Sequence, residues 1–149
     1  MIPVKRLTYK NFEQYGKILD FESDGDQYKI EGGQSEWNVV FDYEKPVGWR
    51  IGIYKGRDHE ITKLECHPSL WETFEPVSGI GILLVAPHEQ PENLEAFLLD
   101  RPVVAKPKIW HWILALSDMA KVKVTEDHTV DKEYHYLKRP LSVFLSETA

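Results

Sequence analysis

The sequence has little cysteine, no long apolar run and no cluster of basic residues. Cys66 is the single cysteine among 149 residues, which excludes a disulfide within the chain and is typical of a reducing compartment. The longest apolar stretch, residues 80–86, is far too short to span a bilayer, and residues 1–7 lack the apolar core of a signal peptide. We therefore expect a cytoplasmic protein with no membrane partner.

The charge of the chain is acidic, with a net value of −6. A nucleic-acid partner requires concentrated cations to replace the counterions of the phosphate backbone, so we expect no such partner. A chain of 149 residues is in the size range of one domain with one core. We expect a single domain over residues 1–149, because the sequence has no repeat, low-complexity tract or linker.

Short β-branched and apolar segments, separated by turn residues, predict a mostly β structure. The expected strands are residues 18–21, 51–54, 60–65, 80–86, 103–106, 111–116, 121–125 and 141–145. We expect two short helices: residues 8–16, which Thr8 can cap and Gly16 can close, and residues 91–100, with Pro91 in the first turn. Many short strands favour an all-β fold, a barrel or a double-sheet jelly roll.

The segment from Glu65 to Glu72 is the strongest chemical signal. Side chains two apart in a strand leave on the same face, so Glu65 and His67 point together while Cys66 points away, and Glu72 can return to their face. Carboxylate and imidazole groups suit a divalent first-row ion, or a general base with an acid beside it. Cys66 is expected as a small buried hydrophobic residue rather than a nucleophile.

The same spacing is similar to the first cupin motif, His-x-His, three or four residues, Glu, six residues, Gly. Here Glu65-x-His67 is followed by four residues, Glu72, and six more to Gly79, so Glu65 takes the place of the first His. The cupin fold draws one more histidine from a later strand, and His111 is the candidate. The resemblance implies a double-stranded β-helix in which these groups share one site.

Four segments, in the same order along the chain, carry a further resemblance. They are residues 4–16, with a leucine, a Thr cap, Phe, Tyr and Gly; residues 64–76, with Leu-Glu-Cys-His-Pro; residues 81–99; and residues 110–116, with Trp-His-Trp. These segments resemble the ureidoglycolate lyase (ureidoglycolate hydrolase) family, which has a cupin-type barrel and is usually homodimeric. The resemblance implies release of urea and glyoxylate from ureidoglycolate in purine and allantoin nitrogen breakdown, and a homodimer.

The chain departs from the family pattern at four places. Cys66 replaces an arginine of the family, Glu72 a glutamine and Trp112 a second histidine, and residues 125–128 replace an Asp-Arg-Gly segment. His128, in that last segment, is a candidate to substitute for a lost ligand or acid. A lost arginine and histidine remove donors for a carboxylate substrate. The alternatives are a diverged cupin that binds or acts on another small polar molecule, such as a sugar or hydroxy acid, and a dimerising barrel with no ligand.

The expected site therefore consists of Glu65, His67, Glu72 and His111, as catalytic groups, metal ligands or both. Glu65 or Glu72 would be the base and His67 or His111 the acid or ligand. Two imidazoles and two carboxylates are compatible with Fe, Mn, Ni or Zn, and such an ion would hold an α-hydroxy acid or ureido acid. We expect the remaining histidines and the segments 22–26 and 131–133 to be solvated surface, and the tryptophans 37, 49 and 71 to be buried anchors.

Overall fold

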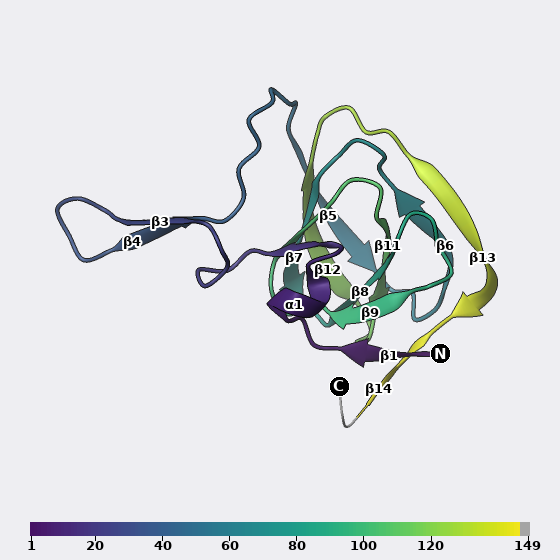
Figure 1. Ribbon diagram of the computed structural model, residues 1–149. Helices are drawn as coiled ribbons and strands as arrows, with labels where there is room; N and C mark the ends of the chain where they lie inside the picture. Colours follow the sequence, from purple (N-terminus) through teal and green to yellow (C-terminus); the bar gives the residue numbers. More distant parts are fainter. Residues whose placement is uncertain (147–149) are drawn as a thin grey trace.

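The computed structural model describes residues 1–146, whose regular structure is almost entirely β (Figure 1). One helix lies among these residues, α1 (Tyr9–Phe12). The strands are β1 (Ile2–Lys5), β2 (Gly16–Ile18), β3 (Asp26–Lys29), β4 (Glu36–Val39), β5 (Arg50–Gly56), β6 (Ile61–Cys66), β7 (Glu72–Ser78), β8 (Gly81–Ala86), β9 (Glu95–Leu98), β10 (Val103–Ala105), β11 (Trp110–Ala115), β12 (Ala120–Glu126), β13 (Glu133–Leu141) and β14 (Val143–Leu145). Within residues 1–146, no helix is long and apolar enough to cross a membrane.

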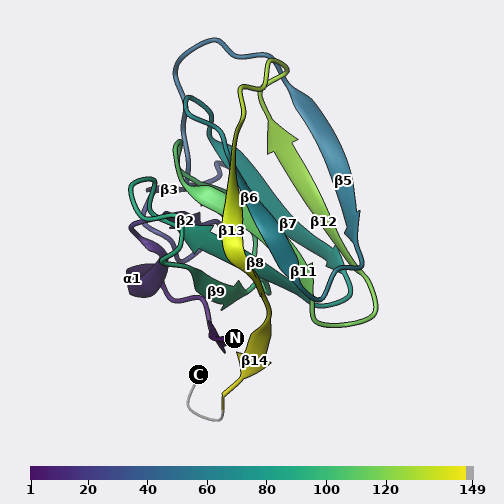
Figure 2. The ribbon, with the colours of Figure 1, turned by 90° about the vertical axis from the view of Figure 1, so that its right-hand side faces the viewer.

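Two sheets form the body of the protein. The first contains seven strands in the order β13-β6-β11-β8-β9-β1-β14, and the second contains five in the order β2-β10-β7-β12-β5. The edge strands β13 and β14 are separated in the chain by Ser142 alone, so the seven-stranded sheet curls until its edges nearly meet (Figures 1 and 2). The predicted all-β, barrel-like architecture is confirmed.

Strand β8 separates two apolar cores, because every residue from Gly81 to Ala86 is buried. Leu83 and Val85 point into the first core, between the two sheets, where they meet side chains such as Phe74 of β7. The alternate residues Ile82 and Leu84 point into a second core, inside the curl of the seven-stranded sheet. A strand buried on both faces reads as an uninterrupted apolar run, which explains why residues 80–86 are so apolar.

Helix α1 closes one end of the first core. Thr8 caps it, since its hydroxyl accepts from the backbone N–H of Asn11 and the Asn11 side chain accepts from the backbone N–H of Thr8. Phe12 then packs edge-on against Phe97, with ring centroids 5.4 Å apart. The helix predicted at residues 8–16 is therefore present, although shorter than expected.

The helix predicted at residues 91–100 is wrong. Residues 91–94 form turns, and Glu95–Leu98 form strand β9, which pairs with β8 and β1. Ala96 faces the second core and Phe97 the first core, so this strand is buried on both sides. Such a strand lacks polar alternation, and the spacing of Leu94, Phe97 and Leu98 then imitates a helix.

Most other predicted strands lie within observed ones. The exceptions are residues 19–21, which leave the sheet after β2 ends at Ile18, Ser142, which falls between β13 and β14, and single end residues of four strands, at positions 60, 80, 106 and 116. Five strands were not predicted, namely β1, β3, β4, β7 and β9, and β13 was predicted only at its end.

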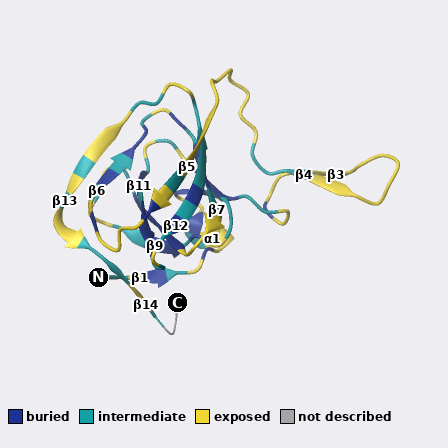
Figure 3. Cartoon of the chain, turned by 180° about the vertical axis from the view of Figure 1, so that it is seen from behind, coloured by how far each residue is buried: buried dark blue, intermediate teal, exposed yellow. Residues whose placement is uncertain are grey.

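The hairpin of β3 and β4 projects from the body (Figures 1 and 3). Its tip lies between Lys29 and Glu36, where Gly32 adopts φ +89°, a left-handed conformation that favours glycine. The hairpin leaves Tyr28 and Trp37 about half exposed. The expectation that Trp37 is a buried anchor is wrong, and Trp49, at 75% exposure, contradicts it as well.

Candidate active site

The four predicted site residues come from three strands and a turn, and they converge at one end of the space between the sheets. Glu65 is on β6, His67 follows that strand, Glu72 begins β7, and His111 lies on β11 directly opposite Glu65. Oε2 of Glu72 lies 2.9 Å from Nε2 of His67 and 3.2 Å from Nε2 of His111. Oε1 of Glu65 lies 3.7 Å from the same nitrogen of His67.

The centre of this cluster is buried. His67, His111 and Glu72 are 4%, 6% and 7% exposed, and Phe74 packs against the His111 ring at 5.3 Å. Charged groups are rarely buried unless they are paired or coordinate an ion. Trp110 and Trp112 alternate with His111 and pack in or against the second core.

Both imidazoles are oriented by backbone carbonyls. Nδ1 of His67 lies 2.7 Å from the carbonyl oxygen of Asp131, and Nδ1 of His111 lies 3.2 Å from that of Ile109. A carbonyl can only accept, so each Nδ1 carries the hydrogen and each Nε2 faces the carboxylates. Histidine ligands of metals are commonly held in this way.

Glu126 belongs to the cluster and was not predicted. It ends β12, its Oε2 lies 3.8 Å from Nε2 of His67, and its Oε1 accepts from Nε and NH2 of Arg50 at 3.0 and 2.5 Å. The alternation along β12 was the available signal, because Val122 and Val124 face inward and Glu126 continues that face. His128, the substitute considered from the sequence, is exposed instead.

The segment 131–133 also supports the site, which contradicts its prediction as plain solvated surface. Besides the Asp131 carbonyl on His67, Nζ of Lys132 lies 3.7 Å from Oε1 of Glu65. Register pairing of β13 with β6 places this segment against the site residues. The sequence offers no local signal for it, because 64 residues separate His67 from Asp131.

The electrostatics of the cluster separate the protonation states of its members. Burial opposes the charged form of His67, but the Glu72 carboxylate, the Asp131 carbonyl and the Glu65 charge outweigh it and raise its pKa to about 9. Burial likewise opposes ionisation of Glu72, yet the charges of His111 and His67 hold its pKa below the usual value. The pKa of Glu126 is raised by burial and by repulsion from Glu72, although Arg50 works against both.

A small cavity of about 100 Å³ opens onto the cluster. Glu65, Glu72 and His111 line it on the polar side, and Tyr54 and Phe74 are among its apolar walls. A wider hollow of about 420 Å³ reaches Glu126 from the other side. The cluster is therefore reached by two hollows, although its central residues are largely buried.

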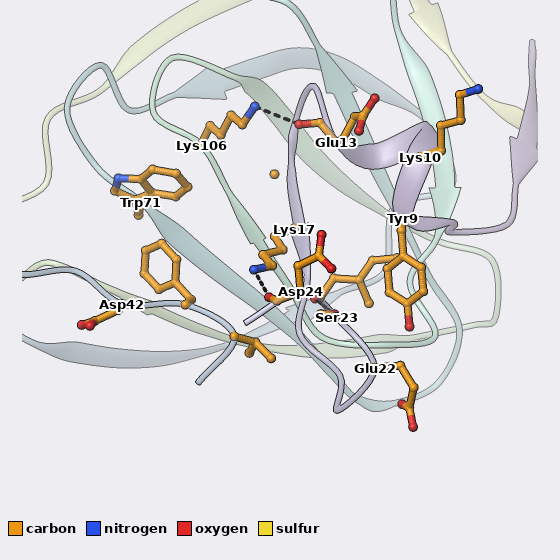
Figure 4. Close-up of a pocket in the computed structure, with 14 residues that line it drawn as sticks. Tyr9, Lys10, Glu13, Lys17, Glu22, Ser23, Asp24, Asp42, Trp71 and Lys106 are labelled. Carbon is orange, nitrogen blue, oxygen red and sulfur yellow. Dashed lines mark hydrogen bonds between the residues drawn. The ribbon is translucent and has the colours of Figure 1, made fainter. Parts of the chain in front are cut away.

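Another hollow, of about 650 Å³, lies beside helix α1 and contains none of the predicted site residues (Figure 4). Trp71 forms part of its wall and packs against Phe41 at a centroid distance of 4.9 Å. The ammonium of Lys106 donates to the carbonyl of Glu13 at 2.8 Å, and that of Lys17 donates to the carbonyl of Asp24. Two of the three lysines that line it, Lys17 and Lys106, are thus occupied by backbone carbonyls.

The residues of the cluster fit a divalent metal ion. Ligand atoms of Glu65, His67 and His111 lie within 4.8 Å of one another, as do those of His67, Glu72 and Glu126. Oε2 of Glu72 is buried and has no aligned hydrogen-bond donor among the described residues, although it lies between the two Nε2 atoms. Two imidazoles and three carboxylates are a usual donor set for first-row ions.

The comparison with protein families matches the description "Ureidoglycolate lyase" over residues 1–144. The chain belongs to the ureidoglycolate lyase family. A curated relative, the ureidoglycolate lyase of Agrobacterium fabrum (strain C58), is 25% identical over 134 residues, covering 78% of this chain and 80% of the relative. The family resemblance stated from the sequence is confirmed.

A solved structure supports the fold alone. NovW, a 4-keto-6-deoxy sugar epimerase from the novobiocin gene cluster of Streptomyces spheroides, superposes with a TM-score of 0.50 at 14% identity, covering 99% of this chain and 87% of that one. At this identity only the barrel-like architecture is shared. In this member of the ureidoglycolate lyase family, the chemistry must be argued from the cluster itself.

Proposed function

We propose that the protein is a ureidoglycolate lyase-type enzyme, which releases urea and glyoxylate from ureidoglycolate in the breakdown of purine and allantoin nitrogen. The observation that supports this function is the convergence of two imidazoles and three carboxylates, largely buried, in a chain of that family. A small polar substrate such as a ureido acid matches a site of this size and polarity.

The reaction requires two proton movements. A base takes the proton of the carbinol hydroxyl, the oxygen forms the carbonyl of glyoxylate, and the C–N bond breaks as the urea nitrogen receives a proton. Glu65 and Glu72 line the cavity and are the candidate bases, and the low pKa of Glu72 keeps it ionised. His67 holds a proton at Nε2 and is the candidate acid.

His111, Glu126 and Arg50 complete the proposed arrangement. His111 lines the cavity with its Nε2 toward Glu72, so it is the second candidate acid or ligand. The raised pKa of Glu126 makes it a further proton carrier, since environments that push two carboxyl pKa values apart separate acid and base roles. Arg50 holds Glu126 in place through Oε1 and leaves Oε2 toward His67.

A divalent ion, Fe, Mn, Ni or Zn, would be held by His67 and His111 with carboxylates from Glu65, Glu72 and Glu126, and it would displace the Nε2 proton of His67, which is then a ligand and no longer an acid. When bound, it would bind the α-hydroxy carboxylate and polarise its oxygen. Arg50 and Lys132 are both paired with carboxylates of the cluster, which leaves them less available to bind the acid group of a substrate. Charge balance therefore supports a metal as the binder of the substrate's acid group.

The test uses the purified full chain, stripped with a chelator and then supplied with each of the four ions in turn. Urea and glyoxylate produced in equal amounts from ureidoglycolate, faster than without protein, support the proposal. If neither the metal-free protein nor any loaded form produces them, the activity is excluded.

A second function is favoured by the family positions that differ. Cys66 replaces an arginine and faces away from the site, and Trp112 replaces a histidine and packs toward the second core. These donors are absent from the cluster, which suits a cupin acting on another hydroxy acid or a sugar. A thermal-shift screen would then reveal a stabilising compound other than ureidoglycolate, with the shift lost in Glu65→Gln/His67→Ala and kept in the exposed control Glu89→Gln/His128→Ala.

A further inference from the structure

A second group of metal-binding side chains lies on the opposite face of β6 from the candidate active site. Cys66, His88 and Glu133 present ligand atoms that all lie within 4.8 Å of one another. None of the three belongs to the active-site cluster. His88 was expected to be a solvated surface residue, but its ring stacks on Trp110, with centroids 5.5 Å apart and planes 3° from parallel.

The fold fixes each of these three groups separately. Glu133 is the register partner of Cys66 across the β13–β6 pair, and opposite residues of a sheet share a face. Cys66 is fully buried, so the packing around it restricts the positions that its sulfur can take. The indole N–H of Trp110 donates to the carbonyl of His88 at 2.9 Å, which anchors the backbone that carries the imidazole.

The distances agree with a tetrahedral ion. Sγ of Cys66 lies 3.8 Å from Oε2 of Glu133, and Nε2 of His88 lies 3.2 Å from the same oxygen. Ordinary Zn–S, Zn–N and Zn–O bonds at tetrahedral angles place sulfur and oxygen about 3.6 Å apart and nitrogen and oxygen about 3.4 Å apart. These two distances are thus within about 0.2 Å of ligating geometry before any ion is bound, and the third pair, Sγ of Cys66 and a ring nitrogen of His88, lies within 4.8 Å.

We propose that Cys66, His88 and Glu133 form a second metal site for Zn²⁺ or a similar borderline ion, with water as the fourth ligand. Thiolate and imidazole favour such ions over Mg²⁺ or Ca²⁺. On binding, the thiol proton is lost to solvent, and the sulfur, which now donates weakly to Glu133, becomes a ligand. The half-exposed side chains of His88 and Glu133 give the ion and the water access from outside.

This site would also tie a segment that supports the active site. Residues 131–133 carry the Asp131 carbonyl that orients His67 and the Lys132 ammonium beside Glu65. An ion that joins Glu133 to Cys66 and His88 would hold this segment against β6. The proposal does not depend on which reaction the protein catalyses.

The single cysteine makes the test specific. Co²⁺ added to the metal-free full chain is expected to give a thiolate-to-metal charge-transfer band with the intensity of one thiolate per chain, which disappears when Zn²⁺ is added. The active-site cluster contains no sulfur, so a His67→Ala/His111→Ala variant keeps the band. Cys66→Ala removes it, and His88→Ala and Glu133→Gln weaken Co²⁺ binding roughly 10-fold or more.

Matched exposed substitutions, His128→Ala and Glu89→Gln, serve as controls and leave the band unchanged. Absence of the band in the folded wild-type protein at millimolar Co²⁺ overturns the proposal, and no variant is needed for that outcome. A band of unchanged affinity in both His88→Ala and Glu133→Gln overturns it as well, because Cys66 would then bind the ion without the other two groups.

Discussion

Cys66 and His67 are neighbours in the chain, yet their side chains serve opposite sides of one sheet. The thiol of Cys66 contacts Glu133 beside the second core, and the imidazole of His67 lies 2.9 Å from Glu72 between the sheets. Alternation at the end of β6 therefore places two different groups of ligands back to back, separated by one strand.

Glu72 is the central carboxylate of the candidate active site, since it lies between both imidazoles. We expect Glu72→Gln to lower kcat for ureidoglycolate about 10²–10⁴-fold, the range for loss of a general base. The control is Glu75→Gln on the same strand, where the carboxylate instead faces Lys123 at 3.6 Å on the outer side. Steady-state kinetics of both variants check this, and equal rates would remove Glu72 from the mechanism.

The raised pKa of His67 predicts how the stability of the metal-free protein depends on pH. The pKa of His67 rises from about 6.5 in the unfolded chain to about 9 in the folded protein. Its protonation therefore stabilises the folded state fully below pH 6.5, and this contribution disappears as the pH rises through 9. The free energy of unfolding should fall by on the order of 2–3 kcal/mol across that window.

Urea unfolding at pH 6, 7.5 and 9 in the presence of a chelator measures this slope. His67→Gln should flatten it, whereas the exposed control His128→Gln should retain it. An equally steep slope in His67→Gln would show that another group is responsible. Because a metal must displace the same proton, ion affinity at the active site should rise over this pH range.

Arg50 orients Glu126 and is expected to act through it. Arg50→Gln removes both donors to Oε1 of Glu126, which frees that carboxylate to turn away from His67. Loss of such a supporting contact typically lowers metal affinity or activity by about 10–100-fold. Isothermal titration with Zn²⁺ and kinetic assays test this, with the exposed Arg57→Gln as the control, and no difference between the two variants would contradict it.

Phe97 is fully buried where helix α1 meets the first core, in contact with Phe12 and Tyr15. Phe97→Ala should lower the free energy of unfolding by about 3–5 kcal/mol, because the cavity left cannot be filled by the neighbouring rings. Phe21→Ala, at an exposed position, should change it by about 0.5 kcal/mol or less. Chemical unfolding curves measure both, and similar losses would refute the assignment of Phe97 as a core anchor.

The sequence predicts the part of the site that depends on local geometry. The alternation of Glu65 and His67 and their spacing to Glu72 follow from strand periodicity, and His111 follows from the family resemblance. Arg50 escaped prediction because its role needs the partner strand to be known, and Glu126 escaped it because the strand predicted at residues 121–125 ended one residue too early. Their pairing depends on the β12–β5 register, which joins Glu126 to Arg50 across 76 residues of chain.

The errors in the fold have a common physical cause. Phe97 and Ala96 are both buried, so β9 has no polar face to reveal its period of two. In β13 exposed and half-buried residues do alternate, but the exposed positions carry aromatic residues, Tyr134 and Tyr136, and a half-buried one carries His135. Periodicity identifies strands whose apolar residues lie on the buried face and whose polar residues lie on the exposed face, and neither strand follows this pattern.

The support of His67 by the Asp131 carbonyl also has a consequence for biosynthesis. The two residues are 64 positions apart, so at roughly 5–20 residues per second the ribosome adds Asp131 roughly 3 to 13 s after His67. Throughout that interval the growing chain lacks the Asp131 carbonyl that orients the imidazole of His67. Assembly of the candidate active site is thus a late event of translation, because it requires β13 and not only the residues from Glu65 to Glu72.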